Sequence, residues 1–173
     1  MEKATFAGGC FWCTEAVFNN LKGVNNVVSG YTGGETSDPA YEVVSTGNTG
    51  HAEAIQITFD PKIISYSDLL RIFWVTHEPT TKDRQGPDVG TQYRSVVFYH
   101  DKEQKKQAEE VKNEAQKLYD SLIVTEIVSF KKFFKAENYH QDYYSKNSKA
   151  FYCKIVIDPK IRKLQKNFKK LLK

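Results

Sequence analysis

The chain has 173 residues, of which 40% are hydrophobic and 27% charged, with a formal net charge of +4. Its length is that of one ordinary domain, and 11 Phe, 10 Tyr and 2 Trp supply enough apolar area for a core, which argues against a disordered or multidomain protein. No apolar run approaches the roughly 20 residues that span a bilayer, and too few follow Met1 for a signal peptide. The sequence predicts a cytoplasmic protein that does not enter membranes.

The positive charge is concentrated at the C-terminus. The segment from Lys160 to Lys173 holds seven Lys and Arg and no acid. Apolar residues recur in it at helical spacing, at Ile161, Leu164, Phe168 and Leu171 or Leu172. This pattern predicts a basic C-terminal helix over 158–173 that docks one apolar stripe and leaves its lysines in solvent. The alternative is a basic helix that meets an acidic partner, and nucleic acid is not an expected partner.

The first half of the chain alternates between strand and helix patterns. Residues 3–7 form a short apolar run that stops at Gly8 and Gly9, and helical periodicity follows over 11–21. A β-branched strand is predicted over 24–31. The Gly-, Ser- and Thr-containing stretch 32–50 is a long loop interrupted by 41–44, and loops of this length in a domain are usually functional.

The second half continues the same alternation. Apolar and polar residues alternate over 54–59, and an amphipathic helix capped by Ser65 and Ser67 follows to His77. After a loop over 78–93, the predicted elements are a strand at 95–99, a polar helix at 101–119 and a strand at 123–130, and the remainder is helical or irregular. Two such strand-helix-strand units predict an α+β sheet with helices on one side.

Cys10 is the first candidate for chemistry. It follows Gly8 and Gly9 and precedes a predicted helix, where free backbone N–H groups and the positive end of the helix dipole favour a thiolate, the nucleophilic form of cysteine. Cys13 lies three residues on and faces the same way, which makes the pair a candidate dithiol. The alternative is a small buried core cysteine.

A CxxC pair serves redox exchange or metal binding, and a structural zinc site needs four ligands. No second pair exists, the four histidines show no i to i+4 pairing, and Cys153 alone does not complete a cluster, so no metal is expected. A cysteine hydrolase with His51 or His140 as base stays open. So does a CxxC metal-binding or adaptor module, in which the aromatic residues beside Cys10 only bind.

Four sequence motifs, in this order along the chain, indicate a known protein family. They are Gly9-Cys10-Phe11-Trp12 followed by Glu15, Gly50-His51-Ala52-Glu53, the run Asp88–Ser95 preceded by Gln85-Gly86, and Ala136–Gln141. Over about residues 4–157 the chain resembles an A-type peptide methionine sulfoxide reductase. The resemblance implies a ferredoxin-like βαβ core with long catalytic loops, to which 158–173 adds the basic helix within a single domain, 1–173. It also implies reduction of the S epimer of methionine sulfoxide by a monomer without bound cofactor, with thioredoxin as reductant.

The resemblance also assigns roles to residues. Expelling a sulfoxide oxygen requires a thiolate to attack sulfur and an acid to protonate the oxygen, roles that fall to Cys10 and Glu53. Tyr41 and Tyr93 match the tyrosines that hold the oxygen. Phe11 and Trp12 match the pocket for the substrate methyl group, and Asp88 matches a residue that positions the site. The alternatives are a solvated Glu53, tyrosines that pack in the core, one core ring among the two pocket aromatics, and an Asp88 that forms a turn.

Two cysteines compete to resolve the sulfenic acid left on Cys10. Cys153 matches the family's recycling cysteine, but it lies in a segment without glycine, and the tail lacks the family's mobile glycine-rich stretch. Cys13 is within disulfide reach of Cys10 at a helix start, so the sequence favours Cys13 over Cys153. Cys153 as an unreactive buried cysteine is the remaining alternative.

Overall fold

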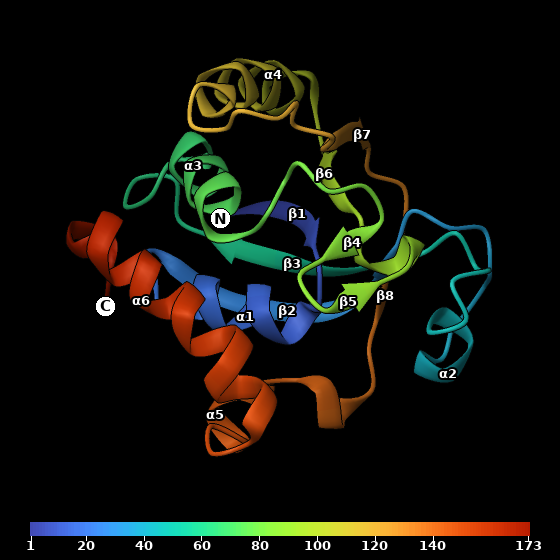
Figure 1. Cartoon of the computed structure of the whole chain (residues 1–173). Helices are drawn as coiled ribbons and strands as arrows, with labels where there is room; N and C mark the ends of the chain where they lie inside the picture. Colours follow the sequence, from blue (N-terminus) through green and yellow to red (C-terminus); the bar gives the residue numbers. More distant parts are fainter.

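A curled six-stranded β-sheet runs through the molecule (Figure 1), and the computed structural model describes all 173 residues. The strand order is β7-β6-β1-β3-β2-β8, in which only β6 and β7 are parallel neighbours. The strands are β1 (Glu2–Gly8), β2 (Val24–Thr32), β3 (Ala52–Phe59), β6 (Ser95–Tyr99), β7 (Glu126–Ser129) and β8 (Phe133–Lys135), and a separate pair comprises β4 (Arg84–Gln85) and β5 (Asp88–Val89). Together with the helices they make a mixed α+β domain.

Helices and short turns lie between these strands and after the last of them. They are α1 (Phe11–Asn19), α2 (Tyr41–Val44), α3 (Tyr66–Thr76), α4 (Lys102–Gln116), α5 (Tyr143–Lys146) and α6 (Asp158–Asn167), with a π-helix at η3 (Cys153–Ile157) and 3-10 turns at η1 (Thr91–Tyr93), η2 (Asn138–His140) and η4 (Lys169–Leu171). Ser65 caps α3 in a capping box with Asp68, and Asp101 caps α4, so side-chain oxygens satisfy helix N–H groups. None of the helices is long and apolar enough to cross a bilayer.

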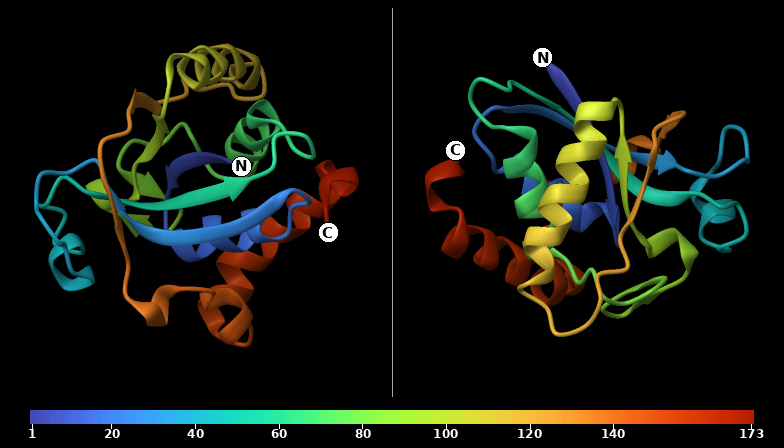
Figure 2. Two further views of the ribbon diagram at one scale, coloured as in Figure 1. Left: turned by 180° about the vertical axis from the view of Figure 1, so that it is seen from behind. Right: turned by 90° about the horizontal axis from the view of Figure 1, so that it is seen from above.

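The two faces of the sheet are packed differently. On one face, Phe6, Ile57 and Val97 belong to a core of 33 buried residues that also includes Phe73 and Leu164 from helices. On the other face lies a small cluster of five residues, none of them from a helix: Ala7, Ala52, Ala54, Val96 and Phe98. The expected arrangement with helices on one side of the sheet is therefore found. The segment that contains α2 projects from one end of the sheet (Figure 2).

Several expectations needed correction. Ser67 does not cap α3; its hydroxyl donates to Gln107 on α4. The strand expected over 123–130 is shorter, and the loop over 78–93 folds into the β4–β5 pair and η1. β8 has no counterpart in the prediction because it has only three residues and pairs solely with the edge of β2, where a Cβ on Gly30 would lie 2.4 Å from the Phe134 carbonyl oxygen.

The C-terminal segment docks on the core. Ile161 and Leu164 of α6 are buried as predicted, but the helix expected over 158–173 is shorter: it ends at Asn167, because Phe168 leaves the helical conformation, and the turn η4 follows. Leu172 forms an isolated bridge with Leu21, at the end of α1. The helix α6 also lies alongside α1, whose N-cap is Cys10.

Candidate active site

A tight turn between β1 and α1 places Cys10. Gly9 has a φ of +92°, and a Cβ there would lie 2.4 Å from the Gln85 side chain, so only glycine fits. Cys10 occupies the N-cap of α1 and is 7% exposed. Because both glycines lie against other side chains, the turn has little room to move, and it sets the backbone position of Cys10.

Glu53 lies directly beside this helix start. β3 carries it into the interior, where it is 2% exposed, and its Oε2 accepts a hydrogen bond of 3.1 Å from the backbone N–H of Phe11. That N–H is one of the donors a helix start leaves unpaired. Burial raises the pKa of Glu53 to about 8. Glu53 is therefore mainly a neutral carboxylic acid at pH 7, next to the residue that follows Cys10.

The Cys10 thiol behaves differently from the expectation. Burial, contact with the Cys13 side chain and the charge of an ionised Glu53 raise its pKa well above the ordinary value. A backbone hydrogen bond from Trp12 acts in the opposite direction but does not prevail. The prediction that the helix start favours a thiolate is thus wrong for the resting site, because burial costs more than one backbone hydrogen bond returns and the Phe11 N–H bonds to Glu53 instead.

Tyr41 and Tyr93 come from the two loops that the sequence marked as functional. Tyr41 begins α2, Tyr93 ends η1, and both side chains are half-buried. Burial, followed by the charge of an ionised Glu53, raises the pKa of each phenol. The structure therefore groups both tyrosines with Glu53, and both O–H groups stay protonated and available as donors at neutral pH.

The two aromatic residues after Cys10 have unequal positions. The Trp12 ring is partly buried and stacks on Tyr143 at 3.7 Å between centroids and 7° between planes. Its Nε1 donates to His140 Nδ1 at 3.0 Å, which fixes the indole. Phe11 is fully buried, with its ring 4.9 Å from His140 and 5.7 Å from Tyr31. Trp12 therefore forms an accessible wall, and Phe11 lies beneath it.

Asp88 connects to the cysteines through a residue that the sequence reasoning did not single out. Tyr152 Oη donates to Asp88 Oδ2 at 2.7 Å and lies 3.6 Å from Cys13 Sγ. Tyr152 directly precedes Cys153, which is fully buried in the π-helix η3, and η3 packs against α1. All three cysteines are free thiols, and Tyr152 links the segment of Cys153 to that of Cys13.

Comparisons of this sequence with known protein families and relatives agree with this geometry. A family model described as peptide methionine sulfoxide reductase matches residues 2–172. The chain belongs to the peptide methionine sulfoxide reductase family. The peptide methionine sulfoxide reductase MsrA of Sulfolobus acidocaldarius is 55% identical over 168 residues, which cover 97% of this chain and 96% of the relative. Members of the family reduce methionine sulfoxide, so the chain is an oxidoreductase.

Solved structures show the same fold. Mxr1 from Saccharomyces cerevisiae in reduced form is 36% identical and matches with a TM-score of 0.82 over 88% of each chain. Mxr1 in complex with Trx2 matches with a TM-score of 0.58 at 27% identity, over 82% of this chain and 84% of that one.

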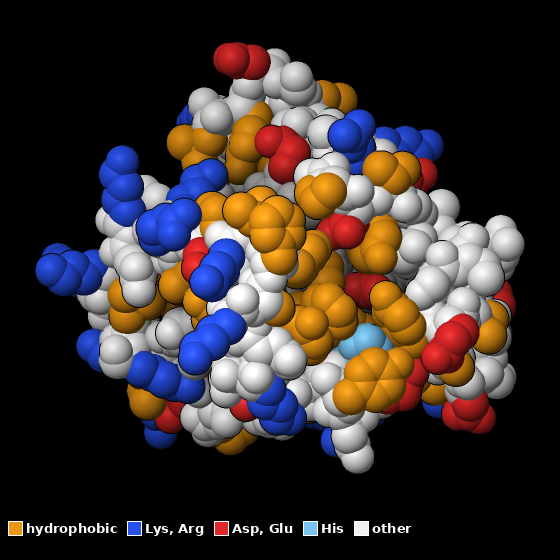
Figure 3. Space-filling view, turned by 60° about the horizontal axis from the view of Figure 1, so that its bottom comes forward, with side chains coloured by type: hydrophobic (Ala, Val, Ile, Leu, Met, Phe, Trp, Pro, Cys, Tyr) orange, Lys and Arg blue, Asp and Glu red, His pale blue; other side chains and the backbone are white.

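On the surface of the reductase, the face that carries α5, α6 and the β4–β5 pair is divided by residue type. Hydrophobic side chains gather in the middle of this face, Lys and Arg lie mainly on the side of α6, and Asp and Glu lie mainly on the opposite side (Figure 3). An apolar centre of this kind suits a methionine side chain, and the asymmetric charge surrounds it.

The hydrolase alternative does not fit the reductase site. His51 Nδ1 accepts from the Gly34 N–H at 3.1 Å and its Nε2 lies 2.7 Å from the Thr36 carbonyl oxygen, so both nitrogens hold the loop. His140 Nδ1 accepts from the Trp12 indole and its Nε2 has no hydrogen-bond partner, so no hydrogen bond joins this imidazole to a cysteine. No group of three or more His, Cys, Asp or Glu side chains is arranged to hold a metal ion.

The reductase site also includes supporting residues that the sequence reasoning left without a role. Glu137 accepts from Tyr31 Oη at 2.9 Å and from the Tyr41 N–H at 3.1 Å, and thereby ties α2 to β2. Lys160 of α6 reaches the interior, where its Nζ donates to the Thr76 carbonyl at 3.1 Å and burial lowers its pKa. Glu137 lay within a recognised motif, whereas nothing in the sequence distinguished Lys160 from the other lysines of the tail.

Proposed function

We propose that Cys10 of this reductase attacks the sulfur of methionine S-sulfoxide, free or in peptides, while Glu53 protonates the departing oxygen. One observation carries the proposal: the Glu53 carboxyl accepts the N–H of the residue after Cys10 and has a pKa of about 8. A carboxylic acid that keeps its proton at neutral pH beside a nucleophile is the arrangement that general acid catalysis needs.

The proposed step conserves charge within the buried site. Cys10 sulfur bonds to the sulfoxide sulfur, Glu53 gives its proton to the oxygen, and the proton of the Cys10 thiol replaces it on Glu53. The substrate S–O bond and the new S–S bond then break as the hydroxyl oxygen bonds to the Cys10 sulfur, so methionine leaves and Cys10 carries the oxygen as a sulfenic acid. The substrate sulfur gains two electrons and Cys10 sulfur loses two. Neutral resting groups suit this route because isolated charges are costly to bury.

The surrounding residues supply orientation. A sulfoxide sulfur is chiral, so fixing its methyl group, its oxygen and the direction of attack selects one epimer. Trp12 above Phe11 would hold the methyl group, and Tyr41 and Tyr93 would donate hydrogen bonds to the oxygen. Asp88 would position the site through Tyr152, to which it is hydrogen-bonded.

Epimer selectivity tests the function. The two epimers of N-acetylmethionine sulfoxide should react differently, with the S epimer reduced at least about 10²-fold faster than the R epimer, because only one places methyl and oxygen correctly. Methionine formation is followed by chromatography and metal content by mass spectrometry of the same preparation. Stoichiometric zinc without methionine formation would support the metal-binding alternative and contradict the proposal.

The wider assignments are proposals of the same kind. We propose thioredoxin as the reductant, supported by the complex of Mxr1 with Trx2, and no bound cofactor. A cytoplasmic location agrees with that reductant, which keeps cytosolic thiols reduced.

We also propose a monomer and a ferredoxin-like core. The core is supported by the β6-β1-β3-β2 order of antiparallel strands, with α1 and α3 as crossovers. In this scheme 1–157 is the family core and 158–173 is the basic C-terminal segment of a single domain.

Disulfide mapping decides which thiol resolves the sulfenic acid. After one equivalent of sulfoxide the parent should contain a Cys10–Cys13 disulfide, because Cys13 lies on the same helical turn, from which it can reach the Cα separation of about 4.4–6.8 Å that a disulfide allows. Turnover with thioredoxin should fall in Cys13→Ala and stay near the parent rate in Cys153→Ala. Mass spectrometry identifies the bridge. A Cys10–Cys153 bridge together with full turnover of Cys13→Ala would assign the step to Cys153.

A further inference from the structure

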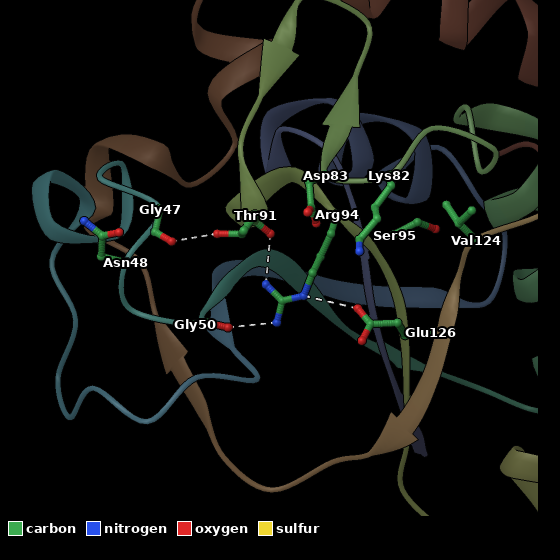
Figure 4. Close-up of a pocket in the computed structure, with 10 residues that line it drawn as sticks. All are labelled: Gly47, Asn48, Gly50, Lys82, Asp83, Thr91, Arg94, Ser95, Val124 and Glu126. Atoms are coloured by element: carbon green, nitrogen blue, oxygen red, sulfur yellow. Dashed lines mark hydrogen bonds and ion pairs between the residues drawn. The ribbon is translucent and has the colours of Figure 1, made fainter.

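A polar cavity of about 600 Å³ lies between the loop that follows α2 and the segment around η1 (Figure 4). It contains neither Cys10 nor Glu53, and the guanidinium of Arg94 crosses it. Arg94 donates to the carbonyls of Gly50 at 2.8 Å and Thr91 at 2.9 Å, and its Nε lies 3.3 Å from Glu126 on β7. One side chain thus joins three separate segments of the chain.

We propose that Arg94 is a positioning residue that holds Tyr41 and Tyr93 in place relative to Glu53, an inference that rests on the function proposed above. The first link is to Tyr93. The backbone N–H and the side chain of Arg94 both bond to the Thr91 carbonyl, so Arg94 closes η1 around Tyr93. Rotation of this short turn would move the phenol.

The second link is to Glu53. The Gly50 carbonyl that accepts from Arg94 lies three residues before Glu53, where the chain enters β3. Gly50 has a φ of +75°, so a hydrogen bond at its carbonyl holds a turn that other residues rarely adopt. Arg94 therefore joins the turn of Tyr93 to the start of the strand that carries Glu53.

The third link reaches Tyr41. The Gln92 side chain donates to the Ser45 carbonyl at 3.3 Å, and Ser45 donates to the Tyr41 carbonyl through its N–H at 2.9 Å and its hydroxyl at 2.7 Å. Thr91 Oγ1 donates to the Gly47 carbonyl at 2.8 Å (Figure 4). The turn that Arg94 closes is thus bonded on its other side to the segment that carries Tyr41.

Arg94 has few substitutes in this role. Arg94 and Glu126 line a second cavity as well, so the guanidinium borders two open spaces. Its planar fork supplies separate donors to two carbonyls and a carboxylate at once, which a lysine ammonium at the same site cannot match in geometry. Small displacements of catalytic groups are costly to rates, because they remove hydrogen bonds made to the transition state.

The experiment compares Arg94→Ala with Arg94→Lys, and Arg71→Ala is the matched control. Arg71 also forms two ion pairs, with Asp68 and Glu114, but on an exposed surface of α3 and α4. In single-turnover reduction of methionine S-sulfoxide, Arg94→Ala should lose about 10- to 100-fold in the rate constant. Arg94→Lys should lose less, and Arg71→Ala should match the parent.

A double-mutant cycle separates positioning from general stability. In a Tyr41→Phe, Tyr93→Phe background the hydroxyls are gone, so adding Arg94→Ala should cost almost nothing more. An equal loss in both backgrounds, or no loss in either, would overturn the proposal. The NMR signals of the Tyr41 and Tyr93 rings should also change in Arg94→Ala and not in Arg71→Ala. This readout needs no turnover: an inactive parent would contradict the proposed function, whereas unchanged ring signals would contradict the role of Arg94.

Discussion

Cys10→Ser is expected to abolish reduction of methionine sulfoxide, with a loss of more than about 10⁴-fold in single-turnover rate. The serine hydroxyl is nearly the size of the thiol, but its far higher pKa denies it the anionic form in a site that already raises the pKa of the cysteine. Folding should change little, since Cys10 is an N-cap and serine is a favoured residue there. The measurement is methionine formed in one turnover without reductant.

Cys13→Ser is the matched control for this experiment. It changes the neighbouring buried thiol of the same helical turn, so it should leave the first turnover nearly intact. If the Cys10→Ser protein forms methionine at close to the parent rate, Cys10 is not the nucleophile, and the role passes to another thiol, most directly that of Cys13. Circular dichroism of both variants checks that the fold is retained.

Glu53→Gln is expected to slow the reductase step by about 10² to 10⁴ at pH 7. Glutamine keeps the shape and can still accept the Phe11 N–H, but it has no proton to transfer. With a pKa of about 8, Glu53 is protonated at pH 6 to 7 and loses its proton above pH 8. The ratio of the parent rate to the variant rate should therefore be largest below pH 7. It should decrease above pH 8, because Glu53 of the parent then loses the proton that it donates.

The measurement is the ratio of single-turnover rates at each pH, in which contributions common to both proteins cancel. Equal rates of parent and variant from pH 6 to 8 would show that Glu53 is not the proton donor and would turn attention to the tyrosines. A difference that widens above pH 8 would require Glu53 to act in its ionised form.

Stability supplies the folding control for Glu53→Gln. The pKa of Glu53 is raised in the folded state from an ordinary value of 4.5, so its neutral form stabilises the fold below about pH 4.5 and this contribution is lost as pH rises toward 8. Glutamine has no ionised form to bury. The free energy of unfolding of the variant, relative to that of the parent, should therefore increase by about 3 kcal/mol as the pH rises from 4.5 to 7. Denaturant titration under reducing conditions measures this difference.

Most regular elements could be predicted because their signals are local. The apolar periodicity around Phe73 fixed α3, Ser65 marked its start, and Gly8 and Gly9 marked the turn before Cys10. The short strand β8 could not be predicted in this way. It is stable only because β2 offers it an edge with a glycine at the point of closest approach, and that information lies about 100 residues earlier in the chain.

The site also has features that the sequence predicts locally and features that depend on the tertiary structure. The sequence alone determined which residue types were present: a cysteine after two glycines at a helix start, a glutamate at the entry of a strand, and tyrosines in long loops. It could not determine protonation, because the pKa of Cys10 and of Glu53 depends on how much solvent the whole fold removes. On local features alone Cys10 was expected as a thiolate, whereas burial raises the pKa of its thiol.

Contacts between distant segments were decided only by the tertiary structure. Glu53 meets the Phe11 N–H 42 residues away, Tyr152 bonds to Asp88 across 64, and Arg94 reaches Gly50 across 44. No periodicity or cap encodes such pairs, since they depend on the order of strands in the sheet and on where each loop returns. The sequence by itself therefore determined most of the regular elements and the chemical groups of this protein. Packing in three dimensions determined which groups touch and which of them carry a proton.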